Sequence, residues 1–132
     1  MALKISLKSG ERIIINGAVI VNGGDRAQFV LQNRANVLRE KDIINEQQAN
    51  SPARRIYFAV QLLHLFPDRE KFHQENFNRF LQQFAEAAPS AMPIVLDIGQ
   101  LVLAGDSYGA LKRCRELIRY EEEVLKHASS AQ

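Results

Sequence analysis

The sequence predicts an α+β fold, in which an N-terminal antiparallel β meander of about five short strands precedes a C-terminal bundle of about four helices. Residues 3–44 show apolar–polar alternation and clusters of β-branched side chains, which are typical of strands. After residue 50, the apolar residues recur with the spacing of helices. We therefore expect a β-rich part, 1–50, and a helical part, 51–132, which together form one compact unit.

Three strands are expected before the first long turn. Residues 3–7 alternate apolar and polar side chains, as a strand with one buried face does. Residues 12–16 are rich in isoleucine, whose branched side chain suits a pleated surface. Asn16-Gly17 tolerates positive φ at both positions, which predicts a tight hairpin into the next strand, 18–21.

Two more strands complete the predicted meander. The turn 22–25 is expected to pair strand 18–21 with strand 27–31. A second turn, 33–36, then leads into the short strand 37–39. The first of these turns contains a glycine pair, but it lacks the Lys and Ser/Thr that follow the glycines of a P-loop. A hairpin turn is therefore a better interpretation than a phosphate-binding loop.

The first two helices have clear boundary signals. Ser51 is a good N-cap and Pro52 suits a first turn, so a helix is expected from there to about Leu65. The next proline stops this helix, and Asp68 is expected to cap the second helix, which ends near Pro89. The residues that form its expected core stripe are Phe77, Phe80, Leu81, Phe84 and Ala88.

The last two helices differ in polarity. Ser90 is expected to cap the third helix, with Pro93 in its first turn. Residues 94–102 are apolar nearly all round, so this helix is expected to be buried in the core or on assembly. Asp106 is expected to cap the fourth helix, and residues 128–132 to form a frayed tail. The side chains of the fourth helix that should face inward are Leu111, Cys114, Leu117, Ile118, Val124 and Leu125.

Length and composition limit the class of protein. A chain of 132 residues with 46% hydrophobic content is typical of one globular domain. No apolar run reaches the ~18 residues that span a bilayer, and the first residues do not have the pattern of a secretory signal. A single cysteine allows no internal disulfide and fits a reducing compartment. We therefore expect a cytoplasmic protein that does not contact a membrane.

Residue types that carry catalysis or bind metals are sparse. Glu70 and His73 have the Glu-x-x-His spacing of di-iron helices, but such a site needs two of these motifs and the sequence has one. Cys114 is expected to be a small core residue, and His64 to be hydrogen-bonded or at the surface. The acidic run 121–123 is expected to be a solvated helix surface. We expect no enzyme, no metal site and no cofactor.

Positive charge is concentrated in the front of the chain. Residues 1–55 carry nine Lys and Arg against five acids, whereas residues 56–132 carry eight against ten. The cations that cluster where the strands meet the first helix are Arg34, Arg39, Lys41, Arg54 and Arg55. Arginine presents a planar fork that suits phosphate, which favours nucleic acid as the ligand. The alternative is that these arginines pair with Glu40, Asp42 and Glu46 at the same junction.

Five segments of the chain form a recognisable pattern. They are residues 3–11, 16–19, 30–33, 37–43 and 52–58. Together they resemble the flagellum biosynthesis repressor FlbT family over nearly the whole chain in length and order. The likeness is most specific around Arg39 and Arg54-Arg55, whereas the helical half is less distinctive.

This resemblance implies a post-transcriptional regulator of flagellin in the cytoplasm of alphaproteobacteria. Members of the family associate with the 5′ untranslated region of flagellin messenger RNA, repress its translation and promote its decay, although the effect is activating in some species. They act alongside FlaF, a partner linked to flagellin itself. No enzymatic activity is expected from such a protein.

The strand-rich part also shows a weaker likeness to the carbon storage regulator CsrA, a small dimeric strand meander that binds RNA leaders. By that likeness, Lys8 and Arg39 match the RNA-binding positions of CsrA. The first strand departs from the pattern, because Leu7-Lys8 stands where a pair of arginines is expected. A correspondence of the two folds is a hypothesis, which requires a sheet within residues 1–44.

The preferred interpretation is an RNA-binding regulator. Phosphate contacts would supply affinity, and unpaired bases of the flagellin leader would supply sequence choice. The predicted RNA-binding residues are Lys8, Arg12, Arg34, Arg39, Lys41, Arg54, Arg55 and Tyr57, the last as a stacking ring. The competing hypothesis is a protein-binding module, in which the apolar third helix and Phe72 dock flagellin, FlaF or a second copy of the chain. A homodimer is preferred to a monomer.

Overall fold

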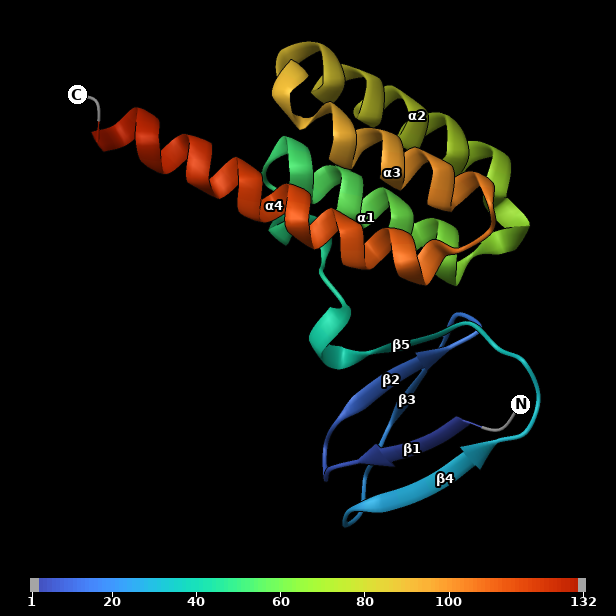
Figure 1. Ribbon diagram of the computed structural model, residues 1–132. Coiled ribbons are helices and arrows are strands. Elements are labelled where there is room, and N and C mark those ends of the chain that lie inside the picture. The colour runs from blue at the N-terminus through green and yellow to red at the C-terminus, as the bar shows by residue number, and fades with distance from the viewer. Residues whose placement is uncertain (1–2, 131–132) are drawn as a thin grey trace. The chain divides into compact units, whose positions relative to one another are not determined.

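The computed structural model describes residues 3–130, with side chains as far as residue 128. It confirms the predicted α+β fold class, since antiparallel strands precede four α-helices (Figure 1). The chain divides into two compact units, Met1–Ile43 and Ile44–Gln132. The expected boundary between a β-rich part, 1–50, and a helical part, 51–132, and the different roles of these parts stay a prediction.

Five strands form the first unit, in two sheets. Strand β1 (Leu3–Leu7) pairs with β4 (Ala27–Leu31). Strand β2 (Arg12–Ile15) lies between β3 (Ala18–Val21) and β5 (Val37–Arg39). All of these pairs are antiparallel. The sheet that the likeness to CsrA requires is therefore present, and the correspondence of the two folds stays a hypothesis.

The predicted hairpin between β2 and β3 is confirmed. Asn16 has φ 51° and Gly17 has φ 82°, and these positive values are what a tight two-residue turn requires. The register places Ile15 opposite Ala18 directly beside the turn. Local residue types therefore determine this hairpin.

The predicted pairing of β3 with β4 is wrong, and with it the simple meander order. Asn22 stabilises the observed arrangement, because its side-chain amide donates hydrogen bonds to the carbonyl oxygens of Leu7 (3.1 Å), Lys8 (3.1 Å) and Asp25 (2.8 Å). The backbone carbonyl of Asn22 also accepts from the N–H of Gly10 at 2.7 Å. These bonds hold the turn after β3 against the end of β1. The chain therefore runs back along β1 instead of along β3.

The core of the strand unit lies under β1 and β2. Its buried centre consists of Ile5, Leu7 and Ile13. The partly buried side chains packed against that centre are Ile15, Phe29, Leu31 and Val37. In contrast, every residue of β3 is exposed, including Val19 at 61% and Val21 at 55%. Strand β3 is an edge strand with hydrophobic side chains in solvent.

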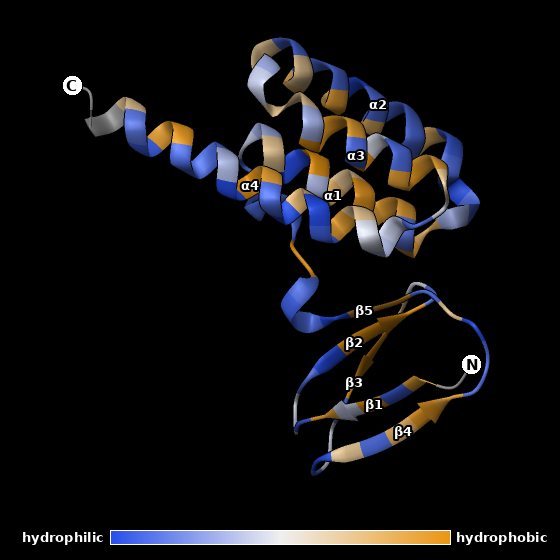
Figure 2. Ribbon diagram, viewed as in Figure 1, coloured by the Kyte–Doolittle hydropathy of each residue, from blue (hydrophilic) through white to orange (hydrophobic). Residues whose placement is uncertain are grey.

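Four α-helices build the second unit: α1 (Pro52–Leu65), α2 (Glu70–Ala87), α3 (Met92–Leu103) and α4 (Ser107–Ser130). Helix α1 packs against both α2 and α4, and α3 packs against α4 and α2. Figure 2 shows hydrophobic and hydrophilic residues alternating along the helices. The fully buried side chains at the centre include Ile56, Phe77, Ile98, Leu111 and Leu117.

Two of the four predicted helix caps are confirmed. The Ser51 hydroxyl accepts from the backbone N–H of Arg54 at 3.2 Å. The Asp106 carboxylate accepts from the backbone N–H of Gly109 at 2.9 Å. Both side chains satisfy donors that have no partner inside a helix.

The caps predicted at Asp68 and Ser90 are wrong. Each residue lies in a short 3₁₀ turn, Pro67–Arg69 and Pro89–Ala91, directly before its helix. Neither α2 nor α3 has a side-chain cap. The prolines begin these turns earlier than the helical pattern alone suggests, because their fixed φ suits the first residue of such a turn.

Apolar faces of α3 and α4 are only partly covered. On α3, Ile98 is buried, whereas Leu96 is 56% exposed and Leu103 is 85% exposed. The inward orientation predicted for Val124 and Leu125 is wrong, because α4 extends past the other helices there (Figure 1). The tail predicted to fray is helical as far as Ser130, and its last two residues lie outside the described part of the chain.

Candidate nucleic-acid interface

A basic hollow of about 320 Å³ lies in the strand unit. Its lining consists of Ser6, Lys8, Glu11, Arg26, Arg39 and Lys41. Four of these side chains are cationic and one is a carboxylate. The hollow therefore carries a local excess of positive charge in a concave surface, which concentrates anions.

Strand pairing brings these cations together. Leu7 at the end of β1 pairs with Ala27 at the start of β4, so the flanking residues Lys8 and Arg26 lie at the same end of that sheet. Arg39 ends β5, and Lys41 follows it in a short 3₁₀ helix. Residues distant in the sequence thus meet at one end of the strand unit.

Arg39 is the anchored member of the group. Its Nη2 donates to the carbonyl oxygen of Ser6 at 2.7 Å and lies 3.6 Å from the Glu11 carboxylate. Glu11 in turn accepts from the backbone N–H of Lys8 at 2.9 Å. That hydrogen bond, together with the charges of Arg39 and Lys8, holds the pKa of Glu11 below its usual value, although some desolvation acts in the opposite direction. Glu11 therefore stays ionised and keeps the guanidinium in position.

Arg12 and Arg34 lie outside the hollow. Arg12 forms an exposed ion pair with Glu40, with 3.8 Å between Nε and Oε1. Arg34 lies in the turn between β4 and β5, where the N–H of Asn36 donates to the Asn16 side chain at 2.9 Å. The β2–β3 turn that contains Asn16 is at the opposite end of the strands from Lys8. The strand unit thus brings together three of its five predicted cations.

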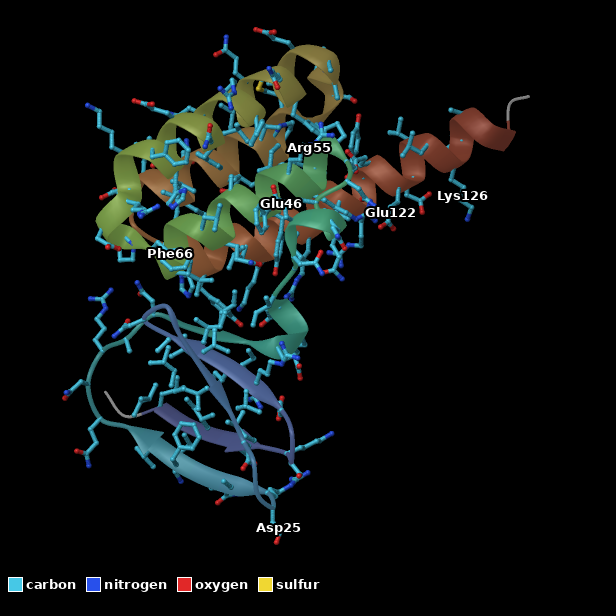
Figure 3. All side chains as sticks on the ribbon, turned by 180° about the vertical axis from the view of Figure 1, so that it is seen from behind. Asp25, Glu46, Arg55, Phe66, Glu122 and Lys126 are labelled. Atoms are coloured by element: carbon cyan, nitrogen blue, oxygen red, sulfur yellow. The ribbon has the colours of Figure 1, made fainter. Side chains whose placement is uncertain are left out.

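In the helical unit, Arg54 is neutralised within the protein. Its Nη2 lies 2.8 Å from the Glu122 carboxylate of α4, beside the N-terminal end of α1 (Figure 3). The neighbouring Glu121 accepts from the backbone N–H of Ala53 at 2.8 Å. These carboxylates offset the unfavourable position of a cation at a helix N-terminus.

Two expectations change as a result. The acidic run 121–123 is not wholly solvated, because Glu121 is 8% exposed and caps α1 across the bundle. Arg39 and Arg54 do pair with acids, but with Glu11 and Glu122 instead of the acids near the junction. Both acidic partners are far from their arginines in the sequence, so the sequence alone does not indicate these pairs.

Tyr57 is buried, at 3% exposure. Arg115 lies over its ring, with 5.9 Å from the guanidinium carbon to the ring centroid, and also contacts its hydroxyl at 3.4 Å. A buried ring presents no face to a base, so we leave Tyr57 out of the candidate interface. The signal was in the sequence, because Ala53, Ile56, Tyr57 and Val60 follow the spacing of one buried helix face.

Arg26 is the functional candidate that sequence reasoning missed. It stands alone in a polar turn, with no basic neighbour in the sequence. Only the pairing of β1 with β4 places it beside Lys8 in the hollow. Arg55, by contrast, is exposed on α1 and belongs to a separate cavity in the helical unit.

Other reactive side chains have structural roles. Cys114 is buried, as predicted, and burial raises the pKa of its thiol. His64 Nδ1 is hydrogen-bonded to the Ser107 hydroxyl at 2.6 Å, which confirms that this histidine is satisfied. Across the described residues, no group of three or more His, Cys, Asp or Glu side chains is arranged to hold a metal ion. In the same part of the chain, no helix is both long enough and apolar enough to cross a membrane.

One family model and several known proteins are similar to this chain. The family model described as flagellar protein FlbT matches residues 3–125. The flagellum biosynthesis repressor protein FlbT of Caulobacter vibrioides (strain ATCC 19089 / CIP 103742 / CB 15) is 46% identical over 135 residues, which cover 98% of this chain and 94% of the relative.

More distant relatives have similar names. The probable flagellum biosynthesis repressor protein FlbT 1 of Bradyrhizobium diazoefficiens is 42% identical, over 94% of this chain and 85% of the relative. The probable repressor FlbT of Agrobacterium fabrum is 31% identical, over 95% and 85% respectively. No solved structure matches the chain. From the match over residues 3–125 and from these relatives, we conclude that the chain belongs to the FlbT family of flagellar proteins.

Proposed function

We propose that this protein represses flagellum biosynthesis after transcription, by binding the 5′ untranslated region of flagellin messenger RNA. The names of its relatives support a regulatory role, because each is called a flagellum biosynthesis repressor. The observation that carries RNA binding is the basic hollow, where four cations surround one carboxylate. On this proposal the protein acts in the cytoplasm, where the messenger is translated, and needs no catalytic step or cofactor.

The hollow suits a single-stranded phosphate backbone. Lys8, Arg26 and Lys41 form no salt bridge with any residue of the described chain, so they can neutralise phosphates without losing an internal partner. Arg39 is held by Ser6 and Glu11, and its planar guanidinium therefore has a defined orientation. Phosphate contacts of this kind set affinity and register, while sequence choice comes from unpaired bases of the leader.

Repression follows from occupancy of the leader. A protein bound there covers the ribosome-binding region, or it changes the fold of the leader and exposes it to nucleases. Both routes lower the amount of flagellin made per transcript. They differ in whether the half-life of the messenger changes, which a decay assay in cells measures directly.

A gel-shift titration of the purified protein tests direct binding. The probes are the protein's own flagellin leader and a scrambled leader, at about 50 mM and about 200 mM salt. If the four cations each contact a phosphate, the slope of log K against log salt is about −2.8, at ~0.7 per contact, and affinity falls about 50-fold over this range. Binding that ignores salt, or that does not distinguish the two leaders, contradicts the proposal.

A second candidate function is docking of a protein partner, such as flagellin or FlaF, with an indirect effect on the messenger. The observation that favours it is the exposed apolar surface of the helical unit, where Leu96, Leu103 and Phe72 are 56%, 85% and 63% exposed. Replacing Leu96 and Leu103 with Ser should abolish partner binding and spare RNA binding. Replacing Arg26 and Lys41 with Ala should do the reverse.

A further inference from the structure

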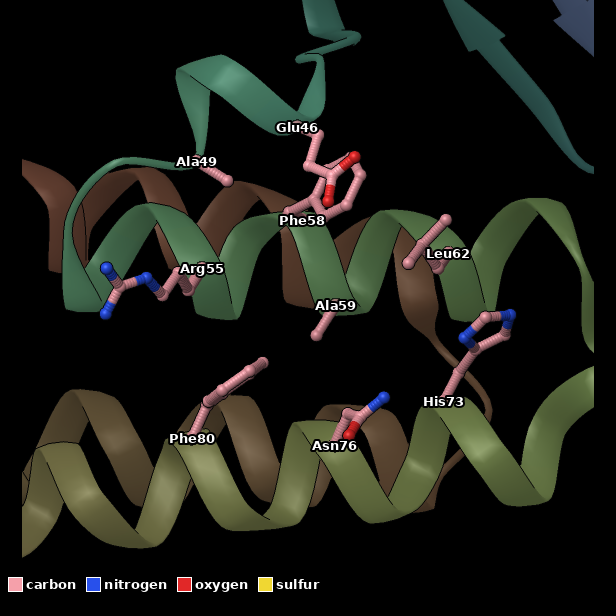
Figure 4. A pocket seen from close by; sticks show the side chains of 9 residues that line it. All are labelled: Glu46, Ala49, Arg55, Phe58, Ala59, Leu62, His73, Asn76 and Phe80. Carbon is pink, nitrogen blue, oxygen red and sulfur yellow. The ribbon is translucent and has the colours of Figure 1, made fainter.

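A cavity of about 400 Å³ lies between α1 and α2 within the helical unit (Figure 4). Its apolar wall includes Phe58, Leu62 and Phe80, and its polar groups include Arg55, Glu46 and His73. The volume lies within the range of ~300–1,000 Å³ that is typical of small-molecule sites. Apolar walls with a few polar groups are the usual composition of such sites.

His73 is an unsatisfied polar group of this cavity. It is 7% exposed, and neither Nδ1 nor Nε2 has a hydrogen-bond partner among the described residues. Its ring packs beside two aromatic rings, with centroids 6.4 Å from Phe66 and 5.5 Å from Phe72. Buried polar atoms are almost always hydrogen-bonded, so an exception in a cavity wall requires an explanation, and a ligand that supplies the missing partner is one.

Arg55 is the cationic group of this cavity, and its side chain is exposed. It forms no salt bridge with a described residue, although Glu46 lines the same cavity. Its neighbour Arg54, one residue earlier, is fully engaged by Glu122. A free guanidinium beside an apolar wall is suited to bind a planar carboxylate through two parallel hydrogen bonds.

The two groups lie at opposite ends of the row of lining residues, with Phe80 and Leu62 between them (Figure 4). Along α1, the seven helical steps from Arg55 to Leu62 span about 10 Å at ~1.5 Å per residue. A ligand that satisfies both groups therefore needs an anion at one end, an apolar body, and a polar atom about 10 Å away.

We propose that this cavity binds a small organic anion with an apolar body, of the aryl or medium-chain carboxylate class. Arg55 holds the carboxylate, Phe58, Leu62 and Phe80 surround the body, and His73 forms a hydrogen bond with a polar group at the far end. No RNA contact of the basic hollow is involved. The site can therefore exist whether or not the hollow binds RNA.

The first experiment uses the full-length protein and 8-anilinonaphthalene-1-sulfonate, a fluorescent aryl anion. We expect saturable binding with one probe per chain, and displacement of the probe by decanoate but not by decanol, which has no charge. Arg55→Gln should weaken probe binding by about tenfold or more, and Arg55→Lys by less. The matched control is Lys71→Gln, which removes an exposed cation of α2 that does not line this cavity and should bind the probe like the wild type.

The second experiment detects the cavity without relying on the probe, which also binds loosened proteins. The ring signals of His73, assigned by comparison with His73→Phe, are followed by NMR as 10-hydroxydecanoate, which carries a hydroxyl at the end opposite its carboxylate, is added. A saturable shift in the wild type that is absent in Arg55→Gln supports the site. Unsaturable probe binding, equal affinity of Arg55→Gln and wild type, or no shift of His73 overturns it.

Discussion

The strand unit and the helical unit both contain arginines that the sequence assigns to one basic surface. The two units differ in how far acidic side chains neutralise those arginines. In the strand unit, Arg39 is held by Glu11 at the edge of a hollow where three further cations have no ion pair with a described residue. In the helical unit, Arg54 is neutralised by Glu122, and Arg55, which has no ion pair within the described part of the chain, lines a cavity. One unit concentrates positive charge, whereas the other cancels it or isolates it.

This difference teaches how to interpret a basic run in a sequence. A cation indicates a ligand only where its folded neighbours fail to neutralise it, and those neighbours are often far away in the chain. Glu122 is 68 residues from Arg54, and its carboxylate lies 2.8 Å from that guanidinium. Four predictions test the contrast, from the largest expected effect to the smallest.

The largest effect is expected from removing free cations of the hollow. Arg26→Ala with Lys41→Ala should weaken binding of the flagellin leader about 100-fold, at about tenfold for each lost charged contact. The salt slope should fall from about −2.8 to about −1.4. A gel-shift titration at several salt concentrations measures both quantities.

Its control removes the same charge elsewhere. Lys4→Ala with Lys71→Ala takes two exposed cations from outside the hollow and should leave affinity within about threefold. Arg54→Gln should behave like this control, because its guanidinium is already paired. If all three proteins lose affinity equally, net charge drives binding and the hollow has no special role.

The next effect concerns the carboxylate that caps α1 from α4. Glu121→Ala removes the acceptor of the Ala53 N–H and should lower the free energy of unfolding by about 1–2 kcal/mol. Chemical denaturation followed by circular dichroism at 222 nm reports this change. Glu123→Ala, on the exposed part of the same run, should change stability by less than about 0.5 kcal/mol. Equal losses would mean that the acidic run acts only through its total charge.

A pH effect is expected from His73. Burial, assisted by the charge of Arg69 and opposed by Asp68, lowers the pKa of this histidine in the folded protein. The unfolded chain, with a histidine pKa of about 6.5, therefore binds the proton more readily, and acidification below about pH 6.5 destabilises the helical unit. Above that pH the contribution is constant. His73→Phe should reduce the change in the free energy of unfolding between pH 7 and pH 5. The control is His127→Gln, at an exposed position, which should keep the dependence of the wild type. If His73→Phe keeps it as well, another group is responsible for the pH dependence.

The smallest effect on the folded monomer is expected at the exposed edge of the strand unit. Val19→Lys changes a residue that is 61% exposed on β3, so stability should stay within about 0.5 kcal/mol. If two copies of the chain pair through this edge, the same change should shift the protein toward the monomer, because charges on an edge strand oppose pairing. Analytical ultracentrifugation distinguishes a shifted dimer from an unchanged one, and an unchanged dimer places the contact elsewhere.

Short-range chemistry accounts for the parts of the fold that could be predicted. The Asn16-Gly17 hairpin and the Ser51 cap depend on neighbouring residues, and both are confirmed. The pairing of β1 with β4 depends on the Asn22 side chain reaching Leu7, 15 residues away, which no local pattern reveals. A second long-range feature, Glu121 as a cap of α1, was not predicted for the same reason.

The residues of the candidate interface could also be predicted only where they are close in the sequence or match a known pattern. Lys8, Arg39 and Lys41 were identified because they are near one another in the sequence or match a known pattern, and they do line one hollow. Arg26 needed the strand pairing. Tyr57 is buried, and the sequence signal for its burial is the helical face on which it lies, not its aromatic type.

The Asn22 linkage also has a consequence for the order of events at the ribosome. Strand β1 leaves the exit tunnel before the other four strands, yet its partner β4 ends only at Leu31, so β1 stays unpaired while the intervening segment is made. The β2–β3 hairpin has both of its strands within residues 12–21 and can close earlier. Strand β1, the earliest of these five strands to be synthesised, is therefore among the last to pair, and during that interval its apolar side chains are accessible to chaperones.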